Sequence, residues 1–305
     1  MFRSAEAELI KAAAMGGKVA IVDDDAAGVL NRAHPLKLKL QVSLCLESTE
    51  DPKKPPFISG LDFMPDGRLV TVDSKNMECV IMNGQLQRQG TPYHFQSNPK
   101  DVVCLSRFDI AVTVSNDVCL LSVSPNNLIC MARVISTSAK LSSICQIFSS
   151  TMVVSAVNDT CPVRMIRMDG VQSDFAHVEF PGKKYTLGES KSTYVPSKNS
   201  LILTDRLAHT VYIYDTMKGT SKAVTNKKLK EPCGACVGPD DTVLVCSRLT
   251  NSIVHLTVEG DFLGTYPLDM TFPRTVCMSA DGTKLAVSNN TKVGRVLQMY
   301  TLFER

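Results

Sequence analysis

Short apolar stretches separated by polar loops return along most of this chain with a spacing of about 40 residues. One copy has an apolar run at 69–72 after an Asp-Gly turn, then a polar loop, then a second run at 79–82. The same order recurs at 243–246 and 253–256, and it begins again at 285–287. A repeat of about 40–50 residues that holds four short strands is typical of a β-propeller blade. The pattern therefore predicts an all-β propeller.

Six copies of this pattern can be placed along the chain. Repeats one to four span about 58–92, 99–136, 142–180 and 190–226, and repeats five and six begin at Pro232 and Pro273. The sixth repeat has three strands before the sequence ends, whereas residues 36–46 alternate strictly between apolar and polar and belong to no repeat. We expect this segment to supply the missing outer strand, which ties the two ends of the ring together. The prediction is a six-bladed β-propeller over 35–305, closed by an N-terminal strand.

Residues 1–34 do not share the strand pattern. Residues 6–15 contain strong helix formers, and two glycines follow at 16–17. We expect a short helix or a disordered N-terminal segment here, or the stub of a longer chain. The segment is too short for a domain of its own.

The composition narrows the type of propeller. Of the 305 residues, 44% are hydrophobic but only 6% are aromatic, and tryptophan is absent. The core must therefore consist of Val, Leu, Ile, Met and Cys, and the WD-type blade, whose signature contains Trp, is disfavoured. A formal net charge of +3, from 33 basic and 30 acidic residues, is too small to indicate nucleic-acid or membrane binding by bulk electrostatics.

The cysteines and the N-terminus indicate a reducing compartment. The 11 cysteines lie mainly among Val, Leu and Met, where Cys behaves as a small hydrophobic residue. The first residues carry no basic segment followed by an apolar core, so no secretory signal is evident. No stretch approaches about 18 uninterrupted apolar residues. We expect a cytoplasmic protein with reduced thiols and no membrane partner.

The loops inside the repeats carry a family resemblance. Repeat one has Val-Asp-Ser-Lys-Asn at 72–76, and comparable loops lie at 204–209 and 246–251. This order of elements resembles the NHL repeat, which has a strand, a short Asp-to-Asn loop, a second strand and an Asp-Gly-like turn. Repeat one departs from that pattern because Met77 and Glu78 stand where an Arg usually follows the loop Asn, and repeats two and three match it more loosely.

The resemblance implies a six-bladed propeller like those at the C-terminus of tripartite-motif (TRIM) ubiquitin ligases. Such propellers are platforms that recognise protein or RNA, while the ligase chemistry lies elsewhere. A RING or B-box would need clustered Cys/His pairs, and this chain has the single pair Cys233-x-x-Cys236. The resemblance therefore implies a recognition platform without ligase chemistry.

Basic residues gather in one class of loops. In a propeller, the loops between second and third strands and the loops between blades open on the same face of the ring. The basic residues expected there are Lys75, Arg206, Lys227, Lys228, Lys230, Arg248, Arg274 and Lys292. Such a face suits an acidic peptide or nucleic-acid phosphates, and the alternative is a solvated surface that binds nothing. Few aromatic residues accompany it, among them Tyr194 and Tyr266, which weakens a base-stacking RNA reader.

The sequence favours no catalytic residue, metal site or cofactor. Gluconolactonase-like six-bladed hydrolases need convergent Glu, Asn and Asp on the inner strands, and Asp62 is the one acidic residue that we assign to those strands. The Asp and Asn residues of the loops, such as Asp73 and Asp205, are expected to form turns. Cys233 and Cys236 are expected to be small residues entering an inner strand rather than a redox pair or half a zinc site. The five histidines form no catalytic spacing with Ser or Cys.

These observations favour a non-catalytic recognition module that binds a protein partner, with a link to ubiquitin-ligase substrate recognition. RNA binding through the same basic face is the first alternative. A degenerate gluconolactonase-like hydrolase is the second, so the question of enzymatic activity stays open. The sequence does not identify the partner or the oligomeric state.

Overall fold

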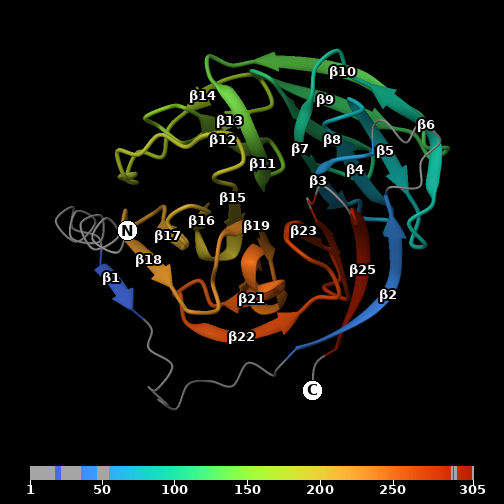
Figure 1. Ribbon diagram of the computed structural model, residues 1–305. Coiled ribbons are helices and arrows are strands. Elements are labelled where there is room, and N and C mark those ends of the chain that lie inside the picture. Colours follow the sequence, from blue (N-terminus) through green and yellow to red (C-terminus); the bar gives the residue numbers. More distant parts are fainter. Residues whose placement is uncertain (1–17, 22–35, 47–54, 290, 292–293, 304–305) are drawn as a thin grey trace.

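Six sheets, five of them with four strands and one with five, are arranged around a central axis in the computed structural model (Figure 1). The structure describes residues 18–21, 36–46, 55–289, 291 and 294–303. The predicted six-bladed β-propeller is confirmed. The helix expected at 6–15 lies outside the described residues.

Each blade runs outward from an inner strand at the central channel. Blade 1 contains β3 (Ile58–Phe63), β4 (Leu69–Asp73), β5 (Glu78–Met82) and β6 (Arg88–His94). Blade 2 contains β7 (Pro99–Cys104), β8 (Asp109–Val114), β9 (Asp117–Val123) and β10 (Ile129–Ser136). Blade 3 contains β11 (Lys140–Phe148), β12 (Thr151–Val157), β13 (Val163–Arg167) and the two-residue β14 (Gln172–Ser173).

The second half of the ring is built in the same way. Blade 4 contains β15 (Ser192–Val195), β16 (Ser200–Asp205), β17 (Thr210–Asp215) and β18 (Ser221–Thr225). Blade 5 contains β19 (Pro232–Val237), β20 (Val243–Ser247), β21 (Ser252–Leu256) and β22 (Phe262–Pro267). Blade 6 contains β23 (Pro273–Met278), β24 (Lys284–Asn289), β25 (Val296–Phe303) and β2 (Lys37–Cys45). Three single-turn 3-10 helices lie at Pro196–Lys198, Pro239–Asp241 and Arg248–Thr250.

The N-terminal strand closes the ring as the sequence predicts. Strand β2 pairs antiparallel with β25, from Lys37 opposite Phe303 to Cys45 opposite Val296. Its residues alternate between exposed and half-buried because an outer strand has one face toward the neighbouring blade and one toward solvent. The chain therefore fastens its first repeat to its last.

The long apolar runs of the sequence are the middle strands of the blades. Every residue of β4, β5, β20 and β21 is buried. These strands are covered on both faces because each blade packs face to face against its two neighbours. One hydrophobic cluster fills each gap between adjacent blades, six in the described residues.

A short strand also lies in the segment for which we expected none. Strand β1 (Lys18–Ile21) pairs parallel with β18 and makes blade 4 five-stranded. The described residues include no helix long and apolar enough to cross a membrane.

The alternation of strand direction divides the loops between two faces of the ring. We call "upper face" the face formed by the turns between second and third strands and by the links between blades. The "lower face" holds the turns between first and second and between third and fourth strands. The upper face is therefore the loop face on which the sequence placed the basic residues.

Candidate functional site

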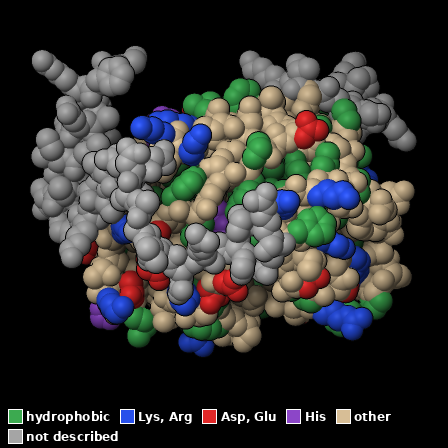
Figure 2. Space-filling view, turned by 90° about the horizontal axis from the view of Figure 1, so that it is seen from below, with side chains coloured by type: hydrophobic (Ala, Val, Ile, Leu, Met, Phe, Trp, Pro, Cys, Tyr) green, Lys and Arg blue, Asp and Glu red, His purple; other side chains and the backbone are tan. Residues whose placement is uncertain are grey.

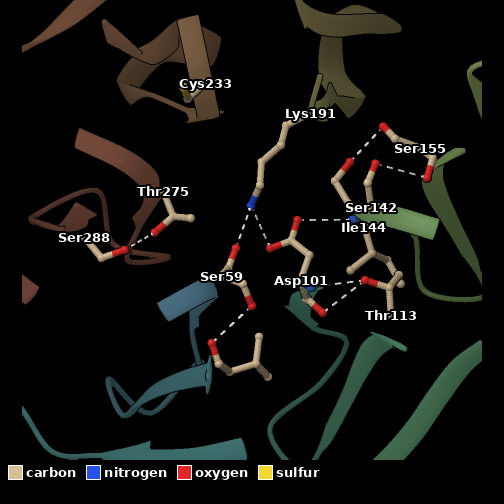
Figure 3. Close-up of polar contacts among 12 residues, drawn as sticks. Ser59, Asp101, Thr113, Ser142, Ile144, Ser155, Lys191, Cys233, Thr275 and Ser288 are labelled. Atoms are coloured by element: carbon tan, nitrogen blue, oxygen red, sulfur yellow. Dashed lines mark hydrogen bonds and ion pairs between the residues drawn. The ribbon is translucent and has the colours of Figure 1, made fainter. Parts of the chain in front are cut away.

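A lysine crosses the central channel just below the upper face. Lys191 immediately precedes β15 of blade 4, and its side chain points toward the inner strands of blades 1 and 2 (Figure 3). Its Nζ lies 3.0 Å from Oδ1 of Asp101 and donates to the carbonyl oxygen of Ser59 at 3.2 Å. Blades 1 and 4 lie opposite each other in a six-bladed ring, so this side chain links opposite sides of the channel.

Asp101 is buried at the centre of this contact. Its Oδ2 accepts a hydrogen bond from the backbone N–H of Ile144 on the next blade at 3.3 Å. Burial raises the pKa of the Asp101 carboxyl, and the ammonium of Lys191 opposes that shift. The expectation that Asp62 is the one acidic inner-strand residue is wrong, because β7 begins at Pro99 and so includes Asp101.

A cavity of about 260 Å³ continues along the channel and is lined by inner-strand residues of all six blades. Asp62 lines it and accepts hydrogen bonds from the backbone N–H groups of Phe63 at 2.9 Å and Cys104 at 2.8 Å. Inner strands have an unpaired edge toward the channel, so Asp62 and Asp101 each satisfy an N–H group of the next blade. Burial raises the pKa of Asp62 to about 7. A carboxyl that titrates near neutrality can exchange a proton with a bound molecule.

Four cysteines line the same cavity, namely Cys104, Cys145, Cys236 and Cys277. Burial raises the pKa of each thiol, which keeps it protonated and unreactive. Cys233 and Cys236 are free thiols on β19, and the Cys233 thiol donates to the carbonyl oxygen of Glu231 at 3.4 Å. Both are buried small residues of an inner strand, as the sequence suggested. Across the described ranges, no three His, Cys, Asp or Glu residues are grouped so that they could hold a metal ion.

Three of the predicted basic residues come together on the upper face, and we call Arg206, Arg248 and Arg274 the arginine cluster. Arg206 and Arg248 occupy equivalent turns of blades 4 and 5, directly after β16 and β20. Their Nη1 atoms lie 3.5 Å and 2.6 Å from the same carboxylate oxygen, Oε2 of Glu231. Two guanidinium groups therefore share one counter-charge.

Arg274 on β23 is the least satisfied member of the arginine cluster. Within the part of the chain that the structure describes, it has no ion pair, and its Nε is buried without a hydrogen-bond partner. Its guanidinium lies 5.6 Å from the centroid of the Phe57 ring and directly against Gly188, where an added Cβ would stand 2.6 Å from Nη2. Burial, together with the charges of Arg206 and Arg248, lowers the pKa of Arg274. The cluster thus holds positive charge that nearby carboxylates only partly neutralise.

Exposed apolar side chains border the arginine cluster. Leu207 and Leu249 follow Arg206 and Arg248 in their turns and are 56% and 48% exposed. Phe272, which is 37% exposed, lies under the Arg248 guanidinium at 4.6 Å. Leu187 and Met77 are also exposed in upper-face loops. The sequence reasoning did not single out these residues, although the repeated Arg-Leu pair was a signal that could have found them.

The other predicted basic residues are more scattered. Lys227, Lys228 and Lys230 are exposed in the link between blades 4 and 5, beside Glu231. Lys75 is exposed in the upper-face turn of blade 1, on the opposite side of the ring from blade 4. Lys292 lies outside the described residues. Viewed from the rim, basic and acidic side chains are interspersed (Figure 2), so that side of the ring carries no extended field of one sign.

The loop carboxylates form turns, as expected. Asp73 Oδ1 accepts hydrogen bonds from the N–H groups of Phe57, Lys75 and Asn76. Asp205 accepts one from Ala208 and pairs with the Nζ of Lys183 at 2.8 Å. These carboxylates are engaged in the turns of the upper face and do not add to the partial neutralisation of the arginine cluster by Glu231.

Comparison with known proteins supports the fold. No family model matches the sequence, and no curated protein sequence matches it. The structure is similar to virginiamycin B lyase from Staphylococcus aureus, with a TM-score of 0.56, 15% identity, and 87% of this chain and 88% of that one covered. It is also similar to a structural-genomics protein of unknown function from Bacteroides thetaiotaomicron, with a TM-score of 0.67, 10% identity, and coverages of 88% and 76%. A luciferin-regenerating enzyme matches with a TM-score of 0.62 at 10% identity, with coverages of 82% and 93%. Identities this low concern the fold alone.

Proposed function

We propose that the protein is a non-catalytic recognition propeller that binds a protein partner through its upper face. The observation that carries this proposal is the arginine cluster with exposed leucines beside it in equivalent turns of two neighbouring blades. Arginine is enriched among the residues that supply most of the binding energy at protein interfaces, and the exposed leucines offer apolar area that a partner can cover. The resemblance to the NHL propellers of TRIM proteins supports a role in recognising substrates for a ubiquitin ligase.

The apolar side chains favour a protein over RNA as the partner. A reader of single-stranded RNA stacks bases on aromatic rings, and the exposed apolar residues nearest the arginine cluster are mostly leucines. Leucine side chains gain free energy when a protein surface covers them, about 25 cal/mol for each Å² removed from water. RNA binding through the same face is therefore the weaker reading.

Affinity capture from nuclease-treated lysate tests the proposal. We expect the double variant Leu207→Ser/Leu249→Ser to lose the partner, because it removes both leucine anchors without touching a charge. Leu128→Ser is the matched control, since Leu128 is 52% exposed in a lower-face turn. Capture that survives in the double variant, or that needs intact RNA, would contradict the proposal.

A second pair of variants tests the charge. Arg248→Gln should weaken capture, whereas Arg107→Gln should not. Arg107 is the matched control because it lies in a lower-face turn with its guanidinium 5.4 Å from the Phe108 ring, as Arg248 does over Phe272. Equal capture by both variants would show that the arginine cluster is not part of the interface.

An enzyme of the six-bladed hydrolase type is the second candidate. The observation that favours it is Asp62, a carboxyl with a pKa of about 7 in the channel cavity, together with the fold similarity to a lyase and to a luciferin-regenerating enzyme. Lactone and ester hydrolysis, measured with and without added Ca²⁺, tests it. Activity that Asp62→Asn abolishes would favour this candidate over a recognition module.

A further inference from the structure

We propose that the arginine cluster is a binding site for a phosphate monoester carried by the partner polypeptide, such as a phosphorylated side chain. This inference rests on the proposed function and specifies the ligand of the same face. The argument follows from the donors left over in the cluster, from its charge and from its surroundings.

Most N–H donors of the arginine cluster are unused in the described structure. Each guanidinium has five N–H donors. Arg206 directs Nε to the carbonyl oxygen of Gly188 and Nη1 to Glu231, and Arg248 directs Nη1 to Glu231. The Nε of Arg274 is buried without a hydrogen-bond partner among the described residues. A buried polar group without a partner costs free energy, and a ligand that supplies an acceptor would offset part of that cost.

The charge of the site matches a dianion. Among the described residues, the cluster of three guanidinium groups forms ion pairs with one carboxylate, that of Glu231, through Arg206 and Arg248, which leaves an excess of about two positive charges. A phosphate monoester carries about −1.5 to −2 at neutral pH, whereas an Asp or Glu side chain carries one charge. A nucleic-acid phosphate is a diester with a single charge. The monoester therefore neutralises the cluster more completely than either competitor.

The geometry also suits a group with several acceptor oxygens. The side chains of Arg206 and Arg248 are each 26% exposed, so they are held in place yet open on one side. Arg274 lies against Gly188, whose lack of a side chain allows the guanidinium to approach the backbone closely. Planar guanidinium groups bind phosphate oxygens in pairs, and three of them from different blades can surround one phosphate.

The neighbouring leucines indicate that the phosphate belongs to a polypeptide. Leu207 and Leu249 are presented next to two of the three arginines. A free phosphate ion would gain nothing from them, whereas a peptide with apolar side chains beside the phosphorylated residue would cover them. The site thus combines a charged anchor with two apolar contacts.

Titration calorimetry with three probes tests the inference at pH 7.5. The probes are inorganic phosphate, the capped peptide acetyl-Leu-phosphoserine-Leu-amide, and the same peptide with Asp in place of phosphoserine. We expect the phosphopeptide to bind about tenfold or more tightly than the Asp peptide. Arg274→Gln should weaken both phosphate-bearing probes about tenfold, and Arg107→Gln should change neither. Leu207→Ser/Leu249→Ser should weaken the phosphopeptide but leave inorganic phosphate unchanged.

The pH dependence gives a second readout that a folding defect does not imitate. The second pKa of a phosphate monoester is about 6, so the affinity for the phosphopeptide should fall as the pH is lowered through that value. Arg248→Gln, in a surface turn, serves as a second variant if Arg274→Gln does not fold. Equal binding of the phosphopeptide and the Asp peptide, equal binding by wild type and Arg248→Gln, or no binding of either phosphate probe would overturn the inference.

Phosphatase treatment separates this inference from the proposed function. The partner should be captured from untreated lysate, and treatment of the lysate with phosphatase should abolish that capture. Capture that persists after phosphatase treatment but is lost in Leu207→Ser/Leu249→Ser would retain the recognition function and contradict the phosphate site. Capture that neither treatment nor variant changes would contradict both.

Discussion

Removing the lysine that crosses the channel should destabilise the whole ring. The change Lys191→Met keeps most of the side-chain length and deletes the ammonium group. The Nζ of Lys191 lies 3.0 Å from Asp101 and 3.2 Å from the carbonyl oxygen of Ser59, so the variant loses an ion pair and a hydrogen bond together. Asp101, whose side chain is 10% exposed, then keeps a buried charge without its cation.

The magnitude follows from what is left behind. Deleting one partner of a buried ion pair costs about 3–5 kcal/mol. The side chain of Lys191 is 17% exposed beside the channel, and Asp101 can take up a proton, so we expect a loss of about 3 kcal/mol at pH 8. In the double variant Lys191→Met/Asp101→Asn no unpaired charge remains, so its loss should be smaller than the sum of the single losses by about 1–3 kcal/mol.

The pH dependence has a definite sign. Burial already raises the pKa of Asp101, and loss of Lys191 raises it further. The folded variant then binds a proton more readily than the unfolded chain, so its stability falls as the pH rises from the unfolded pKa through the folded one. The defect of Lys191→Met should therefore be smaller at pH 5 than at pH 8.

Urea unfolding followed by far-UV circular dichroism measures these effects, since the chain has no tryptophan to report by fluorescence. Lys218→Met is the control, because Lys218 pairs with Asp215 at the surface with 78% of its side chain exposed. A Lys191→Met protein as stable as wild type would refute the reasoning. A defect that neither Asp101→Asn nor low pH relieves would also refute it.

Three further changes test other parts of the structure. The folded pKa of Asp62 is raised to about 7, so this group alone contributes a loss of about 3 kcal/mol as the pH rises from about 4 to 7, and removing it in Asp62→Asn should make the stability rise more with pH than in the wild type, as urea midpoints across this range would show. Burial lowers the pKa of His255 to about 4, so this group alone contributes the opposite slope, a loss of about 3 kcal/mol as the pH falls from 6.5 to 4; a His255→Gln protein with the wild-type slope in the same titration would contradict this. Gly188→Ala should lower the unfolding free energy by about 2 kcal/mol, because Gly188 has φ +76° and its new Cβ would displace Arg274. Gly282→Ala, at φ +69° with open space around it, should lose only the backbone part of about 1 kcal/mol in thermal melts, and equal losses at the two glycines would contradict the contact.

The fold could be predicted because burial leaves a clear trace in the sequence. Strands in the middle of a blade are covered on both faces, which gives uninterrupted apolar runs such as 69–72. The closing strand at 36–46 is covered on one face, which gives strict alternation. The two patterns differ for a physical reason, so they identified both the repeat and its closure. Strand β1 escaped prediction because it is four residues long and lies outside the repeats.

The channel contact could not be predicted from the sequence. Lys191 is the last residue of the link at 174–191, which has no strand pattern, and its partners lie on blades that only the closed ring brings near. Asp101 stands just before the apolar run of its strand and resembled a loop residue. Contacts across a ring depend on blade number and register, which a local pattern does not contain.

The arginine cluster lies between these two cases. Arg206 and Arg248 could be placed on one face because they occupy the same position in successive repeats. Two features depend on how the side chains of three blades meet. One is that Arg274 completes the cluster, and the other is that Glu231 is the one carboxylate that the cluster contacts among the described residues. Lys75 occupies the same position in its repeat but lies on the other side of the ring. An equivalent position in the repeat therefore predicts the face on which a residue lies and not the residues that surround it.

Hydrogen exchange of the protein alone and with its captured partner tests the central claim most directly. If the partner binds the upper face, protection should concentrate in the turns at 206–209 and 248–251 and in the link at 226–231. The lower-face turns at 105–108 and 124–128 should exchange at the same rate in both states. Protection confined to the lower face or to the outer strands would contradict the account.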